Sequence, residues 1–75
     1  MEVKESILRD CKEILKCHIN KEATDWDLWW RQVNAMDKKY SKYSQCEYEY
    51  MQVSIKWMFK ALQTLEGVEL RWQGR

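Results

Sequence analysis

The 75-residue chain has no proline, two glycines and a single histidine. So little glycine excludes a glycine-rich phosphate-binding loop, and the absence of proline leaves long helices uninterrupted. No apolar run approaches the roughly 20 residues of a transmembrane helix, and the acidic N-terminus lacks the basic flank and apolar stretch of a signal peptide. Three cysteines cannot all pair within one chain, which favours reduced thiols. We therefore expect one cytoplasmic domain, residues 1–75, with no membrane contact.

The chain also lacks a large excess of charge of either sign. Its formal net charge is +1, which is typical neither of a strongly basic nucleic-acid-binding domain nor of an acidic mimic of nucleic acid. What the chain has in plenty is aromatic side chains: five Trp, four Tyr and one Phe. This content excludes a disordered segment. It allows so short a chain to fold without a disulfide or a metal, unless a partner chain completes the core.

Apolar residues recur at helical spacing in three segments of the chain. This pattern predicts helices near residues 2–19, 25–42 and 45–66, each with one apolar face. Helices of this size joined by short turns favour an all-α fold, a small antiparallel three-helix bundle. The expected core positions are Val3, Ile7, Leu8, Cys11, Ile14, Leu15 and His18, then Trp26, Trp29, Trp30, Val33, Met36 and Tyr40, and finally Tyr48, Met51, Ile55, Met58, Leu62 and Leu65.

Local signals mark the ends of the predicted helices. Thr24 is the expected N-cap of the second helix, and Ser44 and Glu47 have the form of a capping box at the start of the third. Gly67 is typical of a helix end. The residues after it alternate between apolar and polar, which predicts a short extended C-terminal tail, residues 68–75. Because no glycine or proline separates the second and third segments, one continuous helix is an open alternative.

The third predicted helix carries a second apolar row on the side opposite its core positions, formed by Tyr50, Val53, Trp57 and Ala61. A helix that is apolar on two sides needs something to cover the second side. Two explanations are open. Either the tail folds back so that Trp72 covers this row, or another protein or a second copy of the chain packs against it. The expected contact patch is Tyr50, Val53, Trp57 and Trp72.

The second predicted helix begins with three tryptophans at helical spacing, which is more typical of a core than of an interface. Of the three, Trp26 in the first turn is the one that we expect to be partly exposed. Leu28 points away from the apolar face, and the pattern gives no reason for it. We therefore expect Trp26 and Leu28 to form a secondary protein contact.

A group of basic and aromatic residues suggests an alternative function. Lysines neutralise phosphates and aromatic rings stack on bases, so the two together are typical of sites for nucleic acids or nucleotides. This alternative phosphate site consists of Lys38, Lys39, Lys42, Tyr43 and Arg71. The lysines equally suit the C-terminal end of a helix, where the helix dipole favours cations, so the pattern is not specific.

The chain holds few residues suited to metal binding or catalysis. The candidate zinc ligands are Cys11, Cys17, His18 and Cys46. Their spacing does not match a structural zinc site, whose ligands usually come two to four residues apart. The histidine is expected in the core, and the sequence has no nucleophile elbow. We expect no metal, no cofactor and no enzymatic activity.

These observations favour a small helical binding protein that acts stoichiometrically, by occupying the surface of another protein. In size and aromatic richness, the chain resembles the short accessory and inhibitor proteins of phages and other mobile elements. That resemblance rests on general character and assigns no site residue. It implies an accessory or inhibitor role in the cytoplasm of the host cell.

Overall fold

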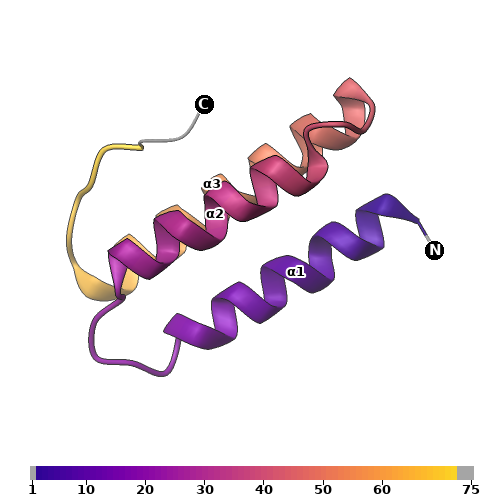
Figure 1. Ribbon diagram of the computed structural model, residues 1–75. Helices are drawn as coiled ribbons and strands as arrows, with labels where there is room; N and C mark the ends of the chain where they lie inside the picture. Colours follow the sequence, from indigo (N-terminus) through magenta and orange to yellow (C-terminus); the bar gives the residue numbers. More distant parts are fainter. Residues whose placement is uncertain (1, 73–75) are drawn as a thin grey trace.

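The computed structural model describes residues 2–72, which form three helices and a short tail. Helix α1 spans Val3–His18, α2 spans Trp26–Tyr40 and α3 spans Gln45–Glu66, and each runs antiparallel to the next (Figure 1). Within the described residues there is no strand, and the tail is irregular. The small all-α three-helix bundle predicted from the sequence is confirmed.

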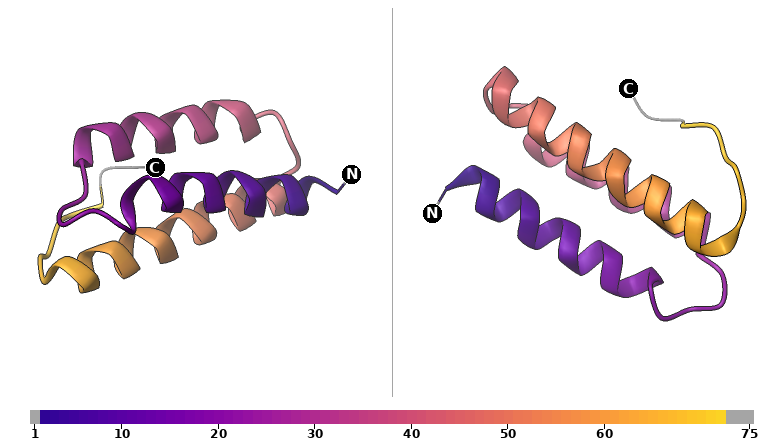
Figure 2. Two further views of the ribbon diagram at one scale, coloured as in Figure 1. Left: turned by 90° about the horizontal axis from the view of Figure 1, so that it is seen from below. Right: turned by 180° about the vertical axis from the view of Figure 1, so that it is seen from behind.

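Of the three helices, α3 makes the most extensive contacts with the other two. In Figure 1, α1 lies below the pair formed by α2 and α3, and the view from below in Figure 2 places α1 along the gap between them. At 22 residues α3 is the longest helix, and it packs against both of the others. The tail turns back along the α2–α3 pair on the side away from α1 (Figure 1). No helix in residues 2–72 combines the length and the apolar character needed to cross a membrane.

The start of α2 differs by one residue from the sequence-based prediction. Asp25 is the N-cap, and its carboxylate accepts a hydrogen bond from the backbone N–H of Leu28 at 3.2 Å. Thr24 is buried, and its backbone N–H donates instead to the carboxylate of Glu66. The prediction of Thr24 as the cap is therefore wrong. Both residue types are good caps, and only the fold shows that Thr24 joins the start of α2 to the end of α3.

The local signals for α3 are confirmed at both ends. Ser44 has an extended backbone and caps the helix, with its hydroxyl 3.4 Å from the backbone nitrogen of Glu47 and 2.9 Å from the carboxylate of that residue. Gly67 ends the helix in the left-handed conformation, with φ +70°, which a residue with a side chain adopts at a cost. A turn at residues 41–44 separates α2 from α3, so the alternative of one continuous helix is wrong.

Most of the predicted core positions are buried, with informative exceptions. Leu8 and Leu65 are 47% and 69% exposed, whereas Phe59, which the apolar spacing did not assign to the core, is only 4% exposed. Since α3 packs against both α1 and α2, its buried face is broader than a single row and extends to Phe59. The buried hydrophobic residues are Ile7, Cys11, Ile14, Trp29, Val33, Met36, Tyr40, Met51, Ile55, Met58, Phe59 and Leu62.

Leu62 and Leu65 offer a matched pair for testing this face of α3. We expect Leu62→Ala to lower the free energy of unfolding by roughly 2–5 kcal/mol, because Leu62 is 2% exposed and its removal leaves a cavity. Leu65→Ala on the same helix should change it by less than about 0.5 kcal/mol. Denaturant unfolding followed by circular dichroism measures both. Equal losses in the two variants would show that the buried face of α3 is wrongly placed.

Candidate protein-binding surface

The second apolar row of α3 is exposed in the structure. Trp57 is 66% exposed and Val53 is 53% exposed, although both lie in the middle of the longest helix. Ala61 is also exposed. Tyr50 is half-buried, and its ring lies beneath the ammonium group of Lys4, whose Nζ is 5.3 Å from the ring centroid. Trp57, Val53 and Ala61 therefore leave a large apolar area open to solvent, of the kind that marks interaction sites.

A shallow hollow of about 270 Å³ lies on this face, between Val53, Lys56, Trp57 and Lys60. Val53 and Trp57 give it an apolar floor, and the ammonium groups of Lys56 and Lys60 give its edge two positive charges. The Nζ of Lys60 lies 5.7 Å from the centroid of the Trp57 ring, a cation–π contact that keeps the lysine beside the indole. The hollow suits an apolar side chain that arrives with a negative charge next to it.

One of the two open explanations required Trp72 to cover Trp57. In the structure Trp72 does not do so. Its ring packs edge-on against Trp30 and Phe59, with both ring centroids 5.3 Å away. The tail is also held to α3 by a hydrogen bond from the backbone N–H of Leu70 to the side chain of Gln63. That explanation is wrong because Phe59, and not Trp57, provides the surface on which Trp72 packs. The predicted contact patch is therefore split, with Trp72 apart from the exposed row.

The tryptophans of α2 belong mainly to the core. Trp29 is fully buried, while Trp26 and Trp30 are partly buried, and all three contact Phe59 at centroid distances of 5.3–6.1 Å. Trp26 retains some exposure, and Leu28 is also partly exposed. The two are two positions apart on α2 and so point to opposite sides of the helix. The predicted secondary contact is therefore not a single patch, and neither residue is as open as Trp57.

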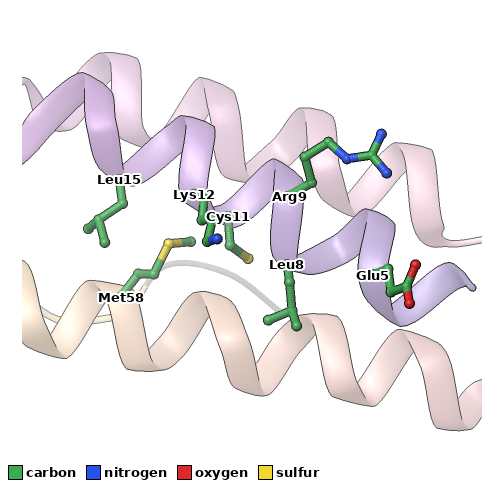
Figure 3. Close-up of a pocket in the computed structure, with 7 residues that line it drawn as sticks. All are labelled: Glu5, Leu8, Arg9, Cys11, Lys12, Leu15 and Met58. Carbon is green, nitrogen blue, oxygen red and sulfur yellow. The ribbon is translucent and has the colours of Figure 1, made fainter.

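A groove between α1 and α3 was not foreseen from the sequence. Figure 3 shows Leu8 and Leu15 of α1 pointing toward α3, with Met58 of α3 beside Leu15 and Cys11 between the two leucines. The volume of this groove is about 520 Å³, and its remaining lining residues are Glu5, Arg9 and Lys12. The apolar positions of α1 cover a wide arc of the helix. That width is a signal in the sequence that the other helices leave part of the arc uncovered, and the structure shows that this part is the edge at Leu8.

The residues of the alternative phosphate site do not come together. Lys38, Lys39 and Lys42 lie at the end of α2 and in the following turn, whereas Arg71 lies in the tail at the opposite end of the bundle (Figure 1). The ring of Tyr43 packs against that of Tyr40 at a tilt, with ring centroids 5.5 Å apart. The structure therefore separates the arginine from the lysines and gives the tyrosine ring a partner within the chain.

Lys39 is also held by an acid of its own chain. Its Nζ lies 2.8 Å from a carboxylate oxygen of Asp10, and the same oxygen accepts a hydrogen bond from the hydroxyl of Tyr40 at 2.6 Å. Partial burial opposes the charge of Asp10, but these two hydrogen bonds outweigh it and lower the pKa of the carboxyl group below 3.8. This group joins α1 to the end of α2.

The cysteines and the histidine are not gathered into a site. Cys11 is buried, and burial raises the pKa of its thiol to about 11, while Cys17 and Cys46 are exposed. The Nε2 atom of buried His18 lies 2.8 Å from the side-chain oxygen of Gln32. Within residues 2–72, no three side chains of the metal-ligating types lie close enough together to hold an ion.

Comparison with known proteins adds no assignment: the chain matches no protein-family model, no curated protein and no solved structure.

The Asp10 group makes a prediction about pH. We expect Asp10→Asn to lower the free energy of unfolding at neutral pH by about 1 kcal/mol, because the bonds from Lys39 and Tyr40 lose their negative acceptor. Since the pKa of Asp10 is lower in the folded protein, its contribution is complete above pH 3.8, the unfolded value, and is lost as the pH falls further. Denaturant unfolding of both proteins across this range measures the difference.

The matched control is Glu13→Gln, in an exposed ion pair with Lys16 on the surface of α1. Such pairs contribute little, so the control should follow the wild type at every pH. A difference between Asp10→Asn and the wild type that persists unchanged at strongly acid pH would contradict the assigned role of the carboxylate.

Proposed function

We propose that this chain is a small protein-binding module whose docking surface is the outer face of α3, formed by Val53, Trp57 and Ala61 with Lys56 and Lys60 at its edge. The observation that carries the proposal is the 66% exposure of Trp57. Trp is the residue type most often found at energetic centres of protein interfaces. An exposed Trp in mid-helix costs solubility and contributes little to this fold, so a role outside the fold explains it best.

Three features of the surroundings support docking of a protein. Val53 extends the apolar area of Trp57 along the helix, and the hollow between Val53 and Trp57 accepts a side chain. The surface belongs to a 22-residue helix packed on two others, so it is rigid before binding. The tail is occupied elsewhere, on Phe59, and leaves the face open.

The proposal includes a cytoplasmic location. Two of the three cysteines, Cys17 and Cys46, are exposed, and all three are free thiols. Free surface thiols are suited to a reducing compartment. The proposal does not include phosphate binding, since Arg71 lies far from the lysines and Lys39 is paired with Asp10.

Site-specific photo-cross-linking in the cells that make the protein tests this function. A benzophenone amino acid at position 57 should yield a discrete adduct with a protein, because that position lies at the centre of the proposed surface. The same probe at Ile19, which is 47% exposed at the end of α1, should yield none. Adding Val53→Asp should abolish the adduct at position 57 while circular dichroism shows an unchanged fold.

The adduct must be reproduced with purified components to count as docking. Trp57→Ala should weaken that reconstituted binding at least about tenfold, the loss typical of a central interface residue, and should change the free energy of unfolding by less than about 0.5 kcal/mol. If position 57 yields no adduct, or if Trp57→Ala unfolds the protein, the outer face of α3 is not a docking surface.

A further inference from the structure

The outer face of α3 has a regular spacing that continues beyond Val53 and Trp57 in both directions. Intervals of four, three, four, three and four residues separate Cys46, Tyr50, Val53, Trp57, Lys60 and Thr64. Alternating intervals of three and four are the repeat of helices that pair along their length. These intervals are the same from either end of the row, whose midpoint lies between Val53 and Trp57, at the level of buried Ile55 along the helix. A row with this symmetry is suited to its own copy running in the opposite direction.

We propose that α3 binds α3 of a second copy of this chain, antiparallel, about a two-fold axis that crosses the outer face between Val53 and Trp57, at the level of residue 55. The inference rests on the proposed function, and it names the partner. In this register the opposed residues are Trp57 and Val53, Tyr50 and Lys60, and Cys46 and Thr64, each pair occurring twice. Such a contact is isologous, so it closes as a dimer.

The sizes of the side chains suit this register. Each Trp57 lies opposite the smaller Val53 of the other copy, so the two most exposed apolar residues in the middle of α3 cover each other. Tyr50 lies opposite the far end of the helix, beside Ala61, where a small residue leaves room for its ring. At the centre of the seam a large side chain thus opposes a smaller one, the arrangement that gives close packing between helices.

The charges also favour an antiparallel pair. Glu49 is exposed and Lys60 lies on the same flank of the row, but 11 residues separate them, about 16 Å along the helix, so they do not meet within one chain. Antiparallel pairing about this two-fold axis places Glu49 of each copy beside Lys60 of the other. A parallel two-fold pair would put the two copies of Glu49 at one level on opposite flanks and would keep Glu49 and Lys60 about 16 Å apart along the axis, so these opposite charges would not meet. An antiparallel pair centred on Trp57 would stack the two indoles and join no opposite charges.

Charge reversal and mixing test both the partner and the register. Sedimentation equilibrium should show a dimer for the wild type, and dimerisation at least about tenfold weaker for Glu49→Lys and for Lys60→Glu, because each reversal creates two repulsive contacts. Mixing the two variants should restore a dimer, because one copy then carries only lysines at these positions and the other only glutamates. Glu13→Lys, on the exposed surface of α1, should dimerise like the wild type.

Each alternative result has a definite meaning. A wild type that stays monomeric at millimolar concentration overturns self-pairing; a foreign adduct at position 57 would then still support the proposed function. A wild-type dimer that tolerates both reversals, or variants that do not recover on mixing, overturn the antiparallel register. Loss of fold in a variant would be seen by circular dichroism, and the recovery on mixing excludes it independently.

A disulfide gives a second, independent test. Cys46 and Thr64 are exposed and lie about 27 Å apart on one α3, so they cannot be joined within a chain. In the Cys17→Ser background, Thr64→Cys should form a disulfide-linked dimer under mild oxidation, and adding Cys46→Ser should abolish it. Glu13→Cys in the same background should cross-link far more slowly. Equal rates for the two introduced cysteines would contradict the register.

Discussion

The packing of aromatic rings around Phe59 is the interaction on which the rest of this structure depends. Phe59 is buried on α3, and its ring contacts Trp26, Trp29 and Trp30 of α2 and Trp72 of the tail, with centroids 5.3–6.1 Å apart. Each such pair adds about 0.5–1.5 kcal/mol beyond the area that it buries. In a chain of 75 residues without a disulfide among residues 2–72, these contacts supply much of what a larger core would otherwise provide.

The same cluster determines which part of the surface is left open. Because Trp72 packs on Phe59 and Trp30, the tail lies on the α2 side of α3 and does not reach Trp57. Helix α1 covers another side of α3, at Met58. The outer row therefore faces solvent as a consequence of the fold, and its exposure is the reason for assigning a function to it. Most of the aromatic residues thus hold the bundle together, whereas Trp57 is displayed on its surface.

The fold could be predicted from the sequence because its signals are local. The apolar spacing within each segment, the capping residues Ser44 and Glu47, and the terminating Gly67 depend only on neighbouring residues. Phe59 could not be assigned in this way. It lies next to the predicted row of α3, and its burial follows from the contact between α3 and α2, which no single helix encodes.

The candidate site was predictable only in part, for the same reason. The row of Val53 and Trp57 follows from helical spacing and is exposed in the structure, but the sequence left open whether Trp72 covers it. A tail of a few residues is long enough to pack on either side of α3. Which side it covers depends on whether Trp72 packs against Phe59 or against Trp57, and local sequence does not show this. The groove between Leu8 and Met58 was missed because the apolar arc of α1 does not reveal which edge the other helices leave uncovered.

The most direct test of this account measures which residue of α3 is coupled to Trp72. Double-mutant cycles by denaturant unfolding, at concentrations where the protein is monomeric, compare Trp72→Ala with Phe59→Leu and with Trp57→Ala. We expect a coupling energy of about 0.5–1.5 kcal/mol between Trp72 and Phe59, whose rings are in contact. Between Trp72 and Trp57 the effects should add within about 0.5 kcal/mol. The reverse pattern, with Trp72 coupled to Trp57 and independent of Phe59, would show that the tail covers the outer row and would contradict the account.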